Sequence, residues 1–256
     1  MISLEHLTKR FGTQTAVDAI SFEIPVGQIV GFLGPNGAGK TTTLKMLTGM
    51  IEPTSGTATV CGFDLRRDTV EVKRRVGFVP ESGAVFESLT GLEYLEMVAA
   101  LYAIPRQAAR DRIRQFISFF DLSFETLTDK LLGSYSKGMR RKVVITAALL
   151  HNPPVVFFDE PLDGLDANAA VGFKTLIQNL AREGKTIVYS SHVLDVVERV
   201  CHRVIIIDKG KLLLDGKPDE LVASHNAGTL ERLFTQLTGG TEVERRAEDF
   251  AKTFSP

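Results

Sequence analysis

The segment Gly34–Thr41 (GPNGAGKT) has the spacing G-x-x-x-x-G-K-[ST] of a phosphate-binding loop. Glycines such as Gly37 and Gly39 let backbone N–H groups turn toward an anion, and a following helix offers its positive N-terminal end. The Lys40 ammonium suits the outer phosphates, and the Thr41 hydroxyl suits Mg²⁺. The spacing therefore predicts a nucleoside triphosphate site. The residues that we expect to bind the nucleotide here are Gly34, Pro35, Asn36, Gly37, Ala38, Gly39, Lys40, Thr41 and Thr42.

Two carboxylates, Asp159 and Glu160, directly follow four apolar residues, Val155–Phe158, which describes a buried strand that ends at a charged site. Asp159 is placed to hold Mg²⁺, and Glu160 to orient or deprotonate the attacking water. His192 follows the next predicted strand, Thr186–Ser190, so it can lie at the same sheet edge and contact the γ-phosphate. Alone, the acidic pair fits a surface turn and the histidine fits a structural role. The phosphate-binding loop makes a hydrolytic site the favoured interpretation.

These side chains must be positioned by an α/β fold. Gln28–Leu33 reads as a buried strand that stops at the glycine-rich loop, and Thr41–Gly49 has apolar residues at helical spacing. This strand–loop–helix order favours a phosphate site over a glycine-rich turn of a Rossmann-like fold. Alternation of strands and helices resumes at Val155 and predicts a mostly parallel, covered sheet. The elements expected there are a helix near 167–183, a strand at 186–190, a helix near 193–200 and strands at 203–207 and 211–214.

The first sixty residues read as strands, and we expect an antiparallel β region there. From about residue 89 to 150 the pattern changes to helical spacing, interrupted at Pro105 and continued over Ala109–Phe120, which predicts a helical insert. The division that we predict is a core domain at 1–220, with the helical subdomain at about 89–150, and a charged helical tail at 221–256.

Composition excludes several classes of protein. The 30 Lys and Arg balance 31 Asp and Glu, so a chain that mainly coats nucleic acid is disfavoured, and 44% hydrophobic residues disfavour disorder. No apolar stretch approaches the roughly 18–20 residues of a membrane-spanning helix, and the N-terminus has no signal pattern. Cys61 and Cys201 cannot build a disulfide framework. We expect a soluble, intracellular chain.

The segment Tyr135–Lys142 (YSKGMRRK) lies shortly before the Asp159–Glu160 strand and resembles the signature L-S-G-G-Q of the ATP-binding cassette (ABC) family, the ATPase subunits of ABC transporters. The resemblance covers about residues 1–220, with the motifs in the family's order. Alone, the segment would read as a serine-capped basic helix that runs to about Leu150. The resemblance implies that its N-terminal end, Ser136, Lys137 and Gly138, binds the γ-phosphate.

The resemblance implies further site residues. Phe11 takes the place of the aromatic residue that stacks on adenine, although a core aromatic would read similarly. Gly164–Asp166 resembles the loop through which two cassettes touch, and Asp166 is therefore assigned to the site. In the family, ATP is bound between the phosphate-binding loop of one cassette and the signature of another. A chain with a single copy of each motif is thus expected to work as a dimer, most simply a homodimer.

Some positions depart from the family pattern. Tyr135, Lys137 and Met139 replace Leu, Gly and Gln of the signature, and the added Lys137 cation should help phosphate binding. Glu81, after Val76–Pro80, stands where the family usually has a Gln that touches Mg²⁺. A carboxylate is still a hard oxygen donor, so Glu81 is included among the expected metal ligands with Thr41 and Asp159.

The resemblance implies an ATPase that uses ATP and Mg²⁺ to energise a polytopic membrane permease supplied by another chain, with no nucleic-acid partner. Such a subunit lies peripherally on the cytoplasmic face of the inner or plasma membrane. The signature variant, Glu81 and the tail Leu230–Gly239 resemble bacterial exporters with a separate permease, including drug- and sodium-efflux types. The alternatives are a non-transport ABC protein, or a P-loop kinase or other soluble NTPase.

Overall fold

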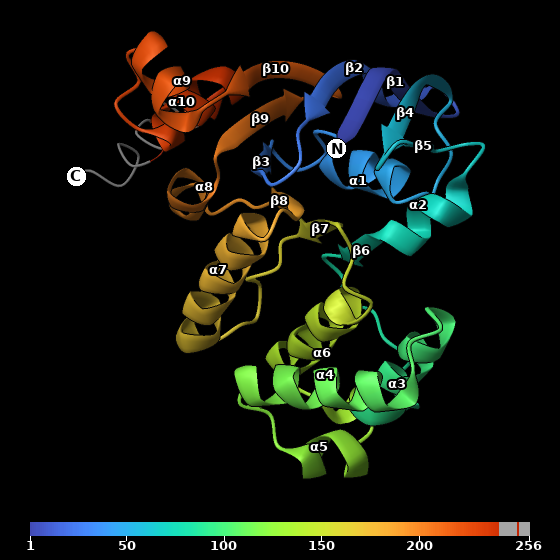
Figure 1. Ribbon diagram of the computed structural model, residues 1–256. Helices are drawn as coiled ribbons and strands as arrows, with labels where there is room; N and C mark the ends of the chain where they lie inside the picture. The colour runs from blue at the N-terminus through green and yellow to red at the C-terminus, as the bar shows by residue number, and fades with distance from the viewer. Residues whose placement is uncertain (241–249, 251–256) are drawn as a thin grey trace.

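A six-stranded sheet forms the centre of the protein in the computed structural model, which describes residues 1–240 and 250 (Figure 1). Its strand order is β10-β9-β3-β8-β7-β6, and every neighbouring pair except β9 and β10 is parallel. The predicted mostly parallel sheet is thereby confirmed. The strands are β3 (Ile29–Leu33), β6 (Val76–Val79), β7 (Val155–Asp159), β8 (Thr186–Ser190), β9 (Arg203–Asp208) and β10 (Lys211–Gly216).

A second, four-stranded sheet is built from the N-terminal part of the chain, and its order is β2-β1-β4-β5. All its pairs are antiparallel, as the sequence predicts. The N-terminal strands are longer than the apolar runs suggest, because β1 and β2 form one hairpin around the tight turn at Gly12. The strands are β1 (Ile2–Phe11), β2 (Gln14–Ile24), β4 (Ser55–Val60) and β5 (Phe63–Asp64).

Helix α1 (Lys40–Leu47) contacts both sheets, through β2 and β4 on one side and β7 on the other. Gly49 follows its C-terminus with a positive φ of 67°, the left-handed conformation that glycine adopts most readily. Strands β3, β7 and β8 are buried along their whole length. Their carboxyl ends therefore bring the glycine-rich loop, Asp159 and Ser190 to one edge of a rigid sheet. The other helices around the sheets are α2 (Thr69–Arg75), α7 (Ala167–Arg182) and α8 (Leu194–Val200).

Between β6 and β7 the chain forms a group of helices with a hydrophobic core of its own, drawn in green and yellow at the lower end of Figure 1. A capping box between Thr90 and Glu93 begins the first helix, and Pro105 precedes the second. Ser136 accepts a hydrogen bond from the Met139 amide at the start of the last one, as the sequence predicts. The helices are α3 (Gly91–Leu101), α4 (Arg106–Phe119), α5 (Phe124–Asp129), a 3₁₀ turn (Leu132–Ser134) and α6 (Lys137–Leu150).

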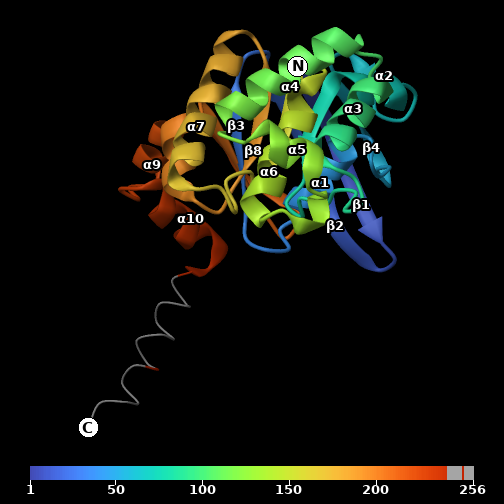
Figure 2. The same cartoon turned by 90° about the horizontal axis from the view of Figure 1, so that it is seen from below.

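Two helices follow the sheets, α9 (Pro218–Ser224) and α10 (Leu230–Thr238). Leu230 and Leu233 of α10 join the core that also holds residues of α7 and α8, and Figure 2 shows α7, α9 and α10 on the same side of the molecule. The boundary predicted at residue 220 falls inside α9, so the division of the chain stays a prediction. The rest of the predicted helical tail, 241–249 and 251–256, lies outside the described residues. Across the described part of the chain, no helix has the length and apolar character that crossing a membrane requires.

Candidate nucleotide site

A cavity of about 660 Å³ opens where the glycine-rich loop meets the carboxyl end of β7. Gly39 has φ +106°, and a Cβ there would lie 2.5 Å from the Ala16 carbonyl oxygen, so only glycine fits this turn between β3 and α1. The turn leaves the N-terminal end of α1 facing the cavity, where an anion is stabilised. The lining residues are Phe11, Gln14, Thr15, Ala16, Asn36, Gly37, Gly39, Lys40, Thr41, Thr42, Glu81, Asp159, Glu160 and Lys209.

Lys40 is the cation nearest the loop backbone. Its Nζ donates hydrogen bonds to the carbonyl oxygens of Gly34, at 2.6 Å, and Pro35, at 3.1 Å. Burial lowers the pKa of Lys40, although the negative charges of Glu160 and Asp159 act to raise it. The ammonium is therefore held by weak, neutral acceptors, which a phosphate oxygen can replace. Gly34, Pro35 and Ala38 do not line the cavity; they shape the loop beneath it.

Thr41 and Asp159 meet at the bottom of the cavity, where the Thr41 hydroxyl donates a 2.8 Å hydrogen bond to Asp159 Oδ2. Asp159 is only 1% exposed, and Glu81 lines the same cavity. The donor set therefore consists of oxygens alone, a hydroxyl and carboxylates beside a phosphate site. Mg²⁺ prefers such oxygen ligands, and it usually uses one or two carboxylates together with substrate phosphates. The residues present fit Mg²⁺.

Glu160 and His192 are in contact, with 2.9 Å between Glu160 Oε2 and His192 Nδ1. The Glu160 amide donates to the Ser190 carbonyl oxygen, and its φ of +50° is uncommon for a residue other than glycine. This turn directs the carboxylate into the cavity, whereas His192 is 76% exposed and is absent from the cavity lining, so its predicted γ-phosphate contact stays a prediction. The arrangement can hold a water and accept its proton.

Phe11 also lines the cavity and is 53% exposed, which suits a stacking platform better than a core position. Lys9 Nζ lies 5.1 Å from the centre of that ring and also donates to the Glu52 carbonyl oxygen. The Lys9 side chain thereby limits the movement of the Phe11 ring.

The signature residues lie elsewhere. Ser136, Lys137, Gly138 and Asp166 are absent from the lining of this cavity, and they gather where α6 and α7 begin. Lys137 pairs with Asp163 at 2.6 Å and Lys142 with Asp166 at 3.1 Å. The start of α6 is thus tied to the loop that follows Glu160. Within one chain these four residues do not complete the nucleotide cavity, and their role stays a prediction.

Sequence reasoning missed two cations near these motifs. Lys209 lines the nucleotide cavity from the turn between β9 and β10, and no sequence motif marks that turn. Arg141 reads in the sequence as part of a basic helix surface, but it is only 2% exposed. No helical period marks its inward position, because the helix is buried at every residue of Val143–Leu150.

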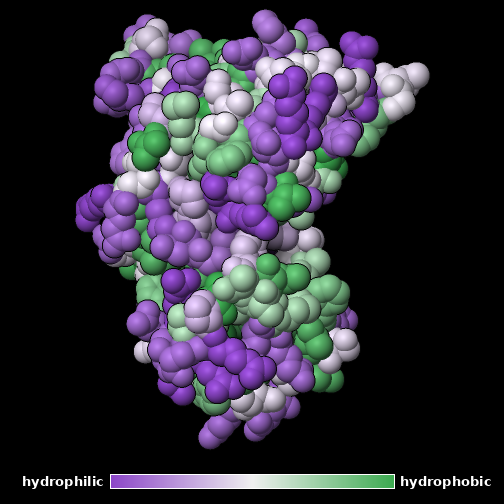
Figure 3. Space-filling model, turned by 45° about the vertical axis from the view of Figure 1, so that its right-hand side comes forward, coloured by the Kyte–Doolittle hydropathy of each residue, from purple (hydrophilic) through white to green (hydrophobic). Residues whose placement is uncertain are grey.

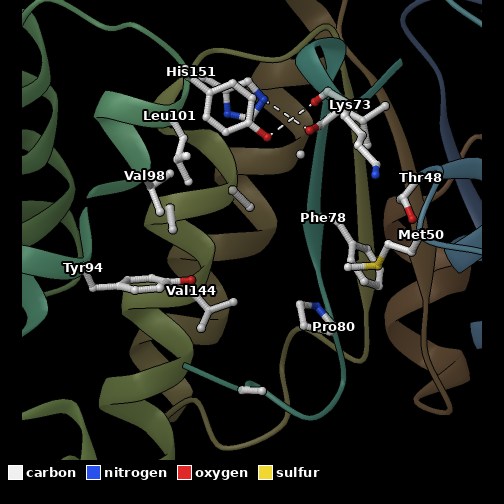
Figure 4. A pocket seen from close by; sticks show the side chains of 16 residues that line it. Thr48, Met50, Lys73, Phe78, Pro80, Tyr94, Val98, Leu101, Val144 and His151 are labelled. Carbon is white, nitrogen blue, oxygen red and sulfur yellow. Dashed lines mark hydrogen bonds between the residues drawn. The ribbon is translucent and has the colours of Figure 1, made fainter. Parts of the chain in front are cut away.

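A second cavity, of about 430 Å³, lies between the sheet and the helical insert (Figure 4). Phe78, Val98, Leu101 and Val144 line it, and Figure 3 shows apolar side chains gathered on this side of the molecule. At one end of the cavity the rings of Tyr102 and His151 stack, with 3.7 Å between their centres. The other lining residues include Met50, Lys73, Pro80 and Tyr94. The sequence does not predict this groove, because its walls come from separate segments.

Comparison with known proteins identifies relatives that are named as ATP-binding proteins, in agreement with the nucleotide cavity. The profile of the family described as "ABC transporter" matches residues 17–163. ABC transporter ATP-binding protein NatA of Bacillus subtilis is 38% identical over 240 residues, covering 91% of this chain and 96% of NatA. A Nod factor export ATP-binding protein I, from Ralstonia nicotianae, is 37% identical over 228 residues, covering 89% and 70%.

Solved structures show the same fold. An ATP-binding subunit of an ABC transporter superposes with a TM-score of 0.87 at 28% identity, covering 93% of this chain and 99% of its own. A dimeric ATP-binding cassette in a post-hydrolysis state, bound to ADP and Pi, has a TM-score of 0.78 at 26% identity, covering 85% and 98%. The chain therefore belongs to the ABC transporter family, as an ATP-binding cassette with ATPase activity.

Proposed function

We propose that this cassette energises a membrane exporter as a dimer in which each ATP lies between two copies of the chain. The observation that carries the proposal is the separation of two half-sites. Lys40, Asp159 and Glu160 line the nucleotide cavity, whereas Ser136 and Gly138 lie on another part of the same chain. A second copy can supply the missing half to each cavity. The dimeric relative with ADP and Pi supports this arrangement.

In the proposed site, Lys40 and the backbone amides of Asn36–Thr41 bind the phosphates, and the Phe11 ring stacks on adenine. Glu160 accepts the proton of the attacking water, and His192 holds the carboxylate in position through the 2.9 Å contact. Thr41, Asp159 and Glu81 would hold Mg²⁺, which supplies positive charge that stabilises the phosphate oxygens.

The facing half-site would close the cavity with the N-terminal end of α6. Ser136 is an exposed cap there, and Lys137 adds a cation. Both features attract anions, because the helix end carries partial positive charge. ATP would hold the two copies together, and hydrolysis would add charge repulsion that separates them.

We infer that the dimer acts on a permease chain, which the match to ATP-binding proteins of ABC transporters supports. We place its contact at the apolar groove of Figure 4, where Pro80 joins the groove to the Glu81 loop of the nucleotide cavity. A movement of Glu81 would then displace Pro80 and be transmitted to a permease bound in the groove. The name of the Ralstonia nicotianae relative, a Nod factor export protein, favours export. The subunit would then lie peripherally on the cytoplasmic face of the membrane.

Substitution of Glu160 by Gln tests the proposal. The amide cannot accept the proton from water, so turnover should fall by about 10²–10⁴-fold while ATP binding persists. An ATP-stabilised dimer should accumulate, measurable by analytical ultracentrifugation. The control is Glu183→Gln, at the end of α7 and outside the cavity, which should leave turnover unchanged.

A Glu160→Gln protein that stays monomeric in saturating Mg²⁺-ATP would contradict the proposed dimer, in which ATP lies between two copies of the chain. The transport role is tested separately by purification from detergent-solubilised membranes. A polytopic membrane protein in the complex is expected, and a complex that is fully soluble would instead support a non-transport ATPase.

A further inference from the structure

Arg141 occupies an unusual position, because it is a cation that is only 2% exposed. Its guanidinium donates to three backbone carbonyl oxygens: NH1 to Pro80 at 2.7 Å, NH2 to Glu81 at 2.8 Å and Nε to Asp163 at 3.3 Å. The acceptors come from two loops that lie far apart in the sequence. One loop carries Glu81 into the nucleotide cavity, and the other joins Glu160 to α7.

Among the residues that the structure describes, no carboxylate forms an ion pair with the Arg141 guanidinium. Burial lowers the pKa of Arg141, whereas the negative charges of four surrounding carboxylates, Asp163, Asp159, Glu81 and Glu160, act to raise it. Three of these line the nucleotide cavity or lie at its base. Arginine suits this position because its planar fork offers several donors in fixed directions, whereas a lysine ammonium of similar reach satisfies fewer acceptors at once.

The helix that carries Arg141 is fixed to the second loop by further contacts. Lys137 pairs with Asp163, and a Cβ on Gly138 would lie 2.4 Å from the Gly164 carbonyl oxygen, so the two backbones are in close contact. The first loop has a different connection. Within the described part of the chain, the hydrogen bonds that join the Glu81 loop to α6 come from Arg141, and Arg140 adds an ion pair at 3.5 Å to Glu87 of that loop. The Arg141 guanidinium is therefore a group of α6 that bonds to both loops at once.

We propose that Arg141 is a positioning residue that holds the Glu81 loop, the 160–166 loop and the start of α6 as one unit. A change at Glu81 caused by nucleotide in one cavity then moves Ser136–Gly138, which face the nucleotide of the second copy. Arg141 thereby couples the two ATP sites. This inference rests on the proposed dimer, since Ser136–Gly138 face a nucleotide only in a second copy.

The test uses Arg141→Lys in the Glu160→Gln background, where ATP traps the dimer. The dimer dissociation constant in saturating Mg²⁺-ATP should rise about tenfold, the factor that corresponds to one lost hydrogen bond to a charged group. ATP affinity of the dilute monomer should stay the same, because Arg141 does not line the cavity. In the chain with Glu160 restored, the Hill coefficient of ATP hydrolysis should fall toward one.

Arg112→Lys is the matched control, because Arg112 of α4 also donates to a backbone carbonyl oxygen, that of Leu150 at 2.7 Å, but contacts neither loop. It should change neither dimerisation nor the Hill coefficient. An Arg141→Lys protein that dimerises as tightly as Glu160→Gln alone would overturn the coupling role. Failure of Glu160→Gln itself to dimerise would instead overturn the proposed dimer.

A second measurement keeps Arg141 and does not depend on the folding of the Arg141→Lys variant. Amide hydrogen exchange of the Glu160→Gln protein is followed during an ATP titration in three segments: 80–85, 136–140 and 161–166. Protection should develop at one common ATP midpoint if the three segments move as a unit. Separate midpoints for the Glu81 loop and the start of α6 would contradict the proposal.

Discussion

His192 Nδ1 lies 2.9 Å from Glu160 Oε2, although the two residues follow different strands, β8 and β7. The strands are parallel neighbours, with Asp159 opposite Ser190, so their carboxyl ends meet at one edge of the sheet. The Glu160 amide also bonds to the Ser190 carbonyl oxygen, which keeps the two strand ends together. The sheet thus fixes the distance between the proposed base and its neighbour before any nucleotide binds.

Replacement of Lys40 by Ala should weaken ATP binding by at least about tenfold to a hundredfold. The change removes a charge-assisted contact of roughly 1.5–3 kcal/mol from the phosphates. Equilibrium dialysis or fluorescence titration measures the affinity. Lys45→Ala, at the exposed C-terminal end of α1, is the control and should bind ATP normally. An unchanged ATP affinity of Lys40→Ala would show that Lys40 does not bind the phosphates.

Replacement of Glu81 by Gln should raise the Mg²⁺ concentration needed for half-maximal ATPase activity. A neutral amide oxygen is a weaker ligand than a carboxylate, and a loss of about 1 kcal/mol corresponds to about fivefold. At saturating Mg²⁺ the maximal rate should stay nearly unchanged. Glu198→Gln, on the exposed surface of α8, serves as the control. Loss of activity even at saturating Mg²⁺ would assign Glu81 an essential role in turnover.

Replacement of Gly138 by Ala should impair dimer formation without affecting the monomer's nucleotide affinity. The new Cβ would lie 2.4 Å from the Gly164 carbonyl oxygen, so the 160–166 loop must shift. Overpacking of this kind costs about 1–3 kcal/mol, and the ATP-trapped dimer should weaken by about tenfold or more. Gly172→Ala, also in a helix, meets only the flexible Phe119 ring at 3.3 Å and should have little effect. Equal dimerisation of the two variants would contradict the prediction.

Protonation of His151 should lower the free energy of unfolding of the protein in mild acid. Burial lowers its pKa from 6.5 to about 4, and the cations Lys185 and Arg112 add to this effect. Because the unfolded chain binds the proton more readily, this stability is fully present above pH 6.5 and is lost as the pH falls toward 4.

Replacement of His151 by Phe keeps a ring to stack on Tyr102 but removes the titration. Between pH 7 and pH 5 the free energy of unfolding should fall by about 1–2 kcal/mol less than in the unmodified chain. Urea denaturation at the two pH values measures the difference, with the exposed His225→Asn as control. An unchanged pH dependence in His151→Phe would show that this imidazole does not titrate on unfolding.

The sequence by itself determined the chemistry of the nucleotide cavity and the elements next to it. Gly34–Thr41 and Asp159–Glu160 are local motifs, in which neighbouring residues make a turn or a strand end, and their order predicts the mostly parallel sheet. The Ser136 cap of α6 is local in the same way, since its hydrogen bond reaches only three residues along the chain.

Only the tertiary structure decided which distant groups meet. Arg141 reads as one cation of a basic helix, yet it joins carbonyl groups some twenty and sixty residues away in the sequence. The groove of Phe78, Val98 and Val144 likewise needs the sheet and the insert to pack together. Hydrogen bonds and burial between remote segments depend on packing of the whole chain, and local residue spacing does not encode them.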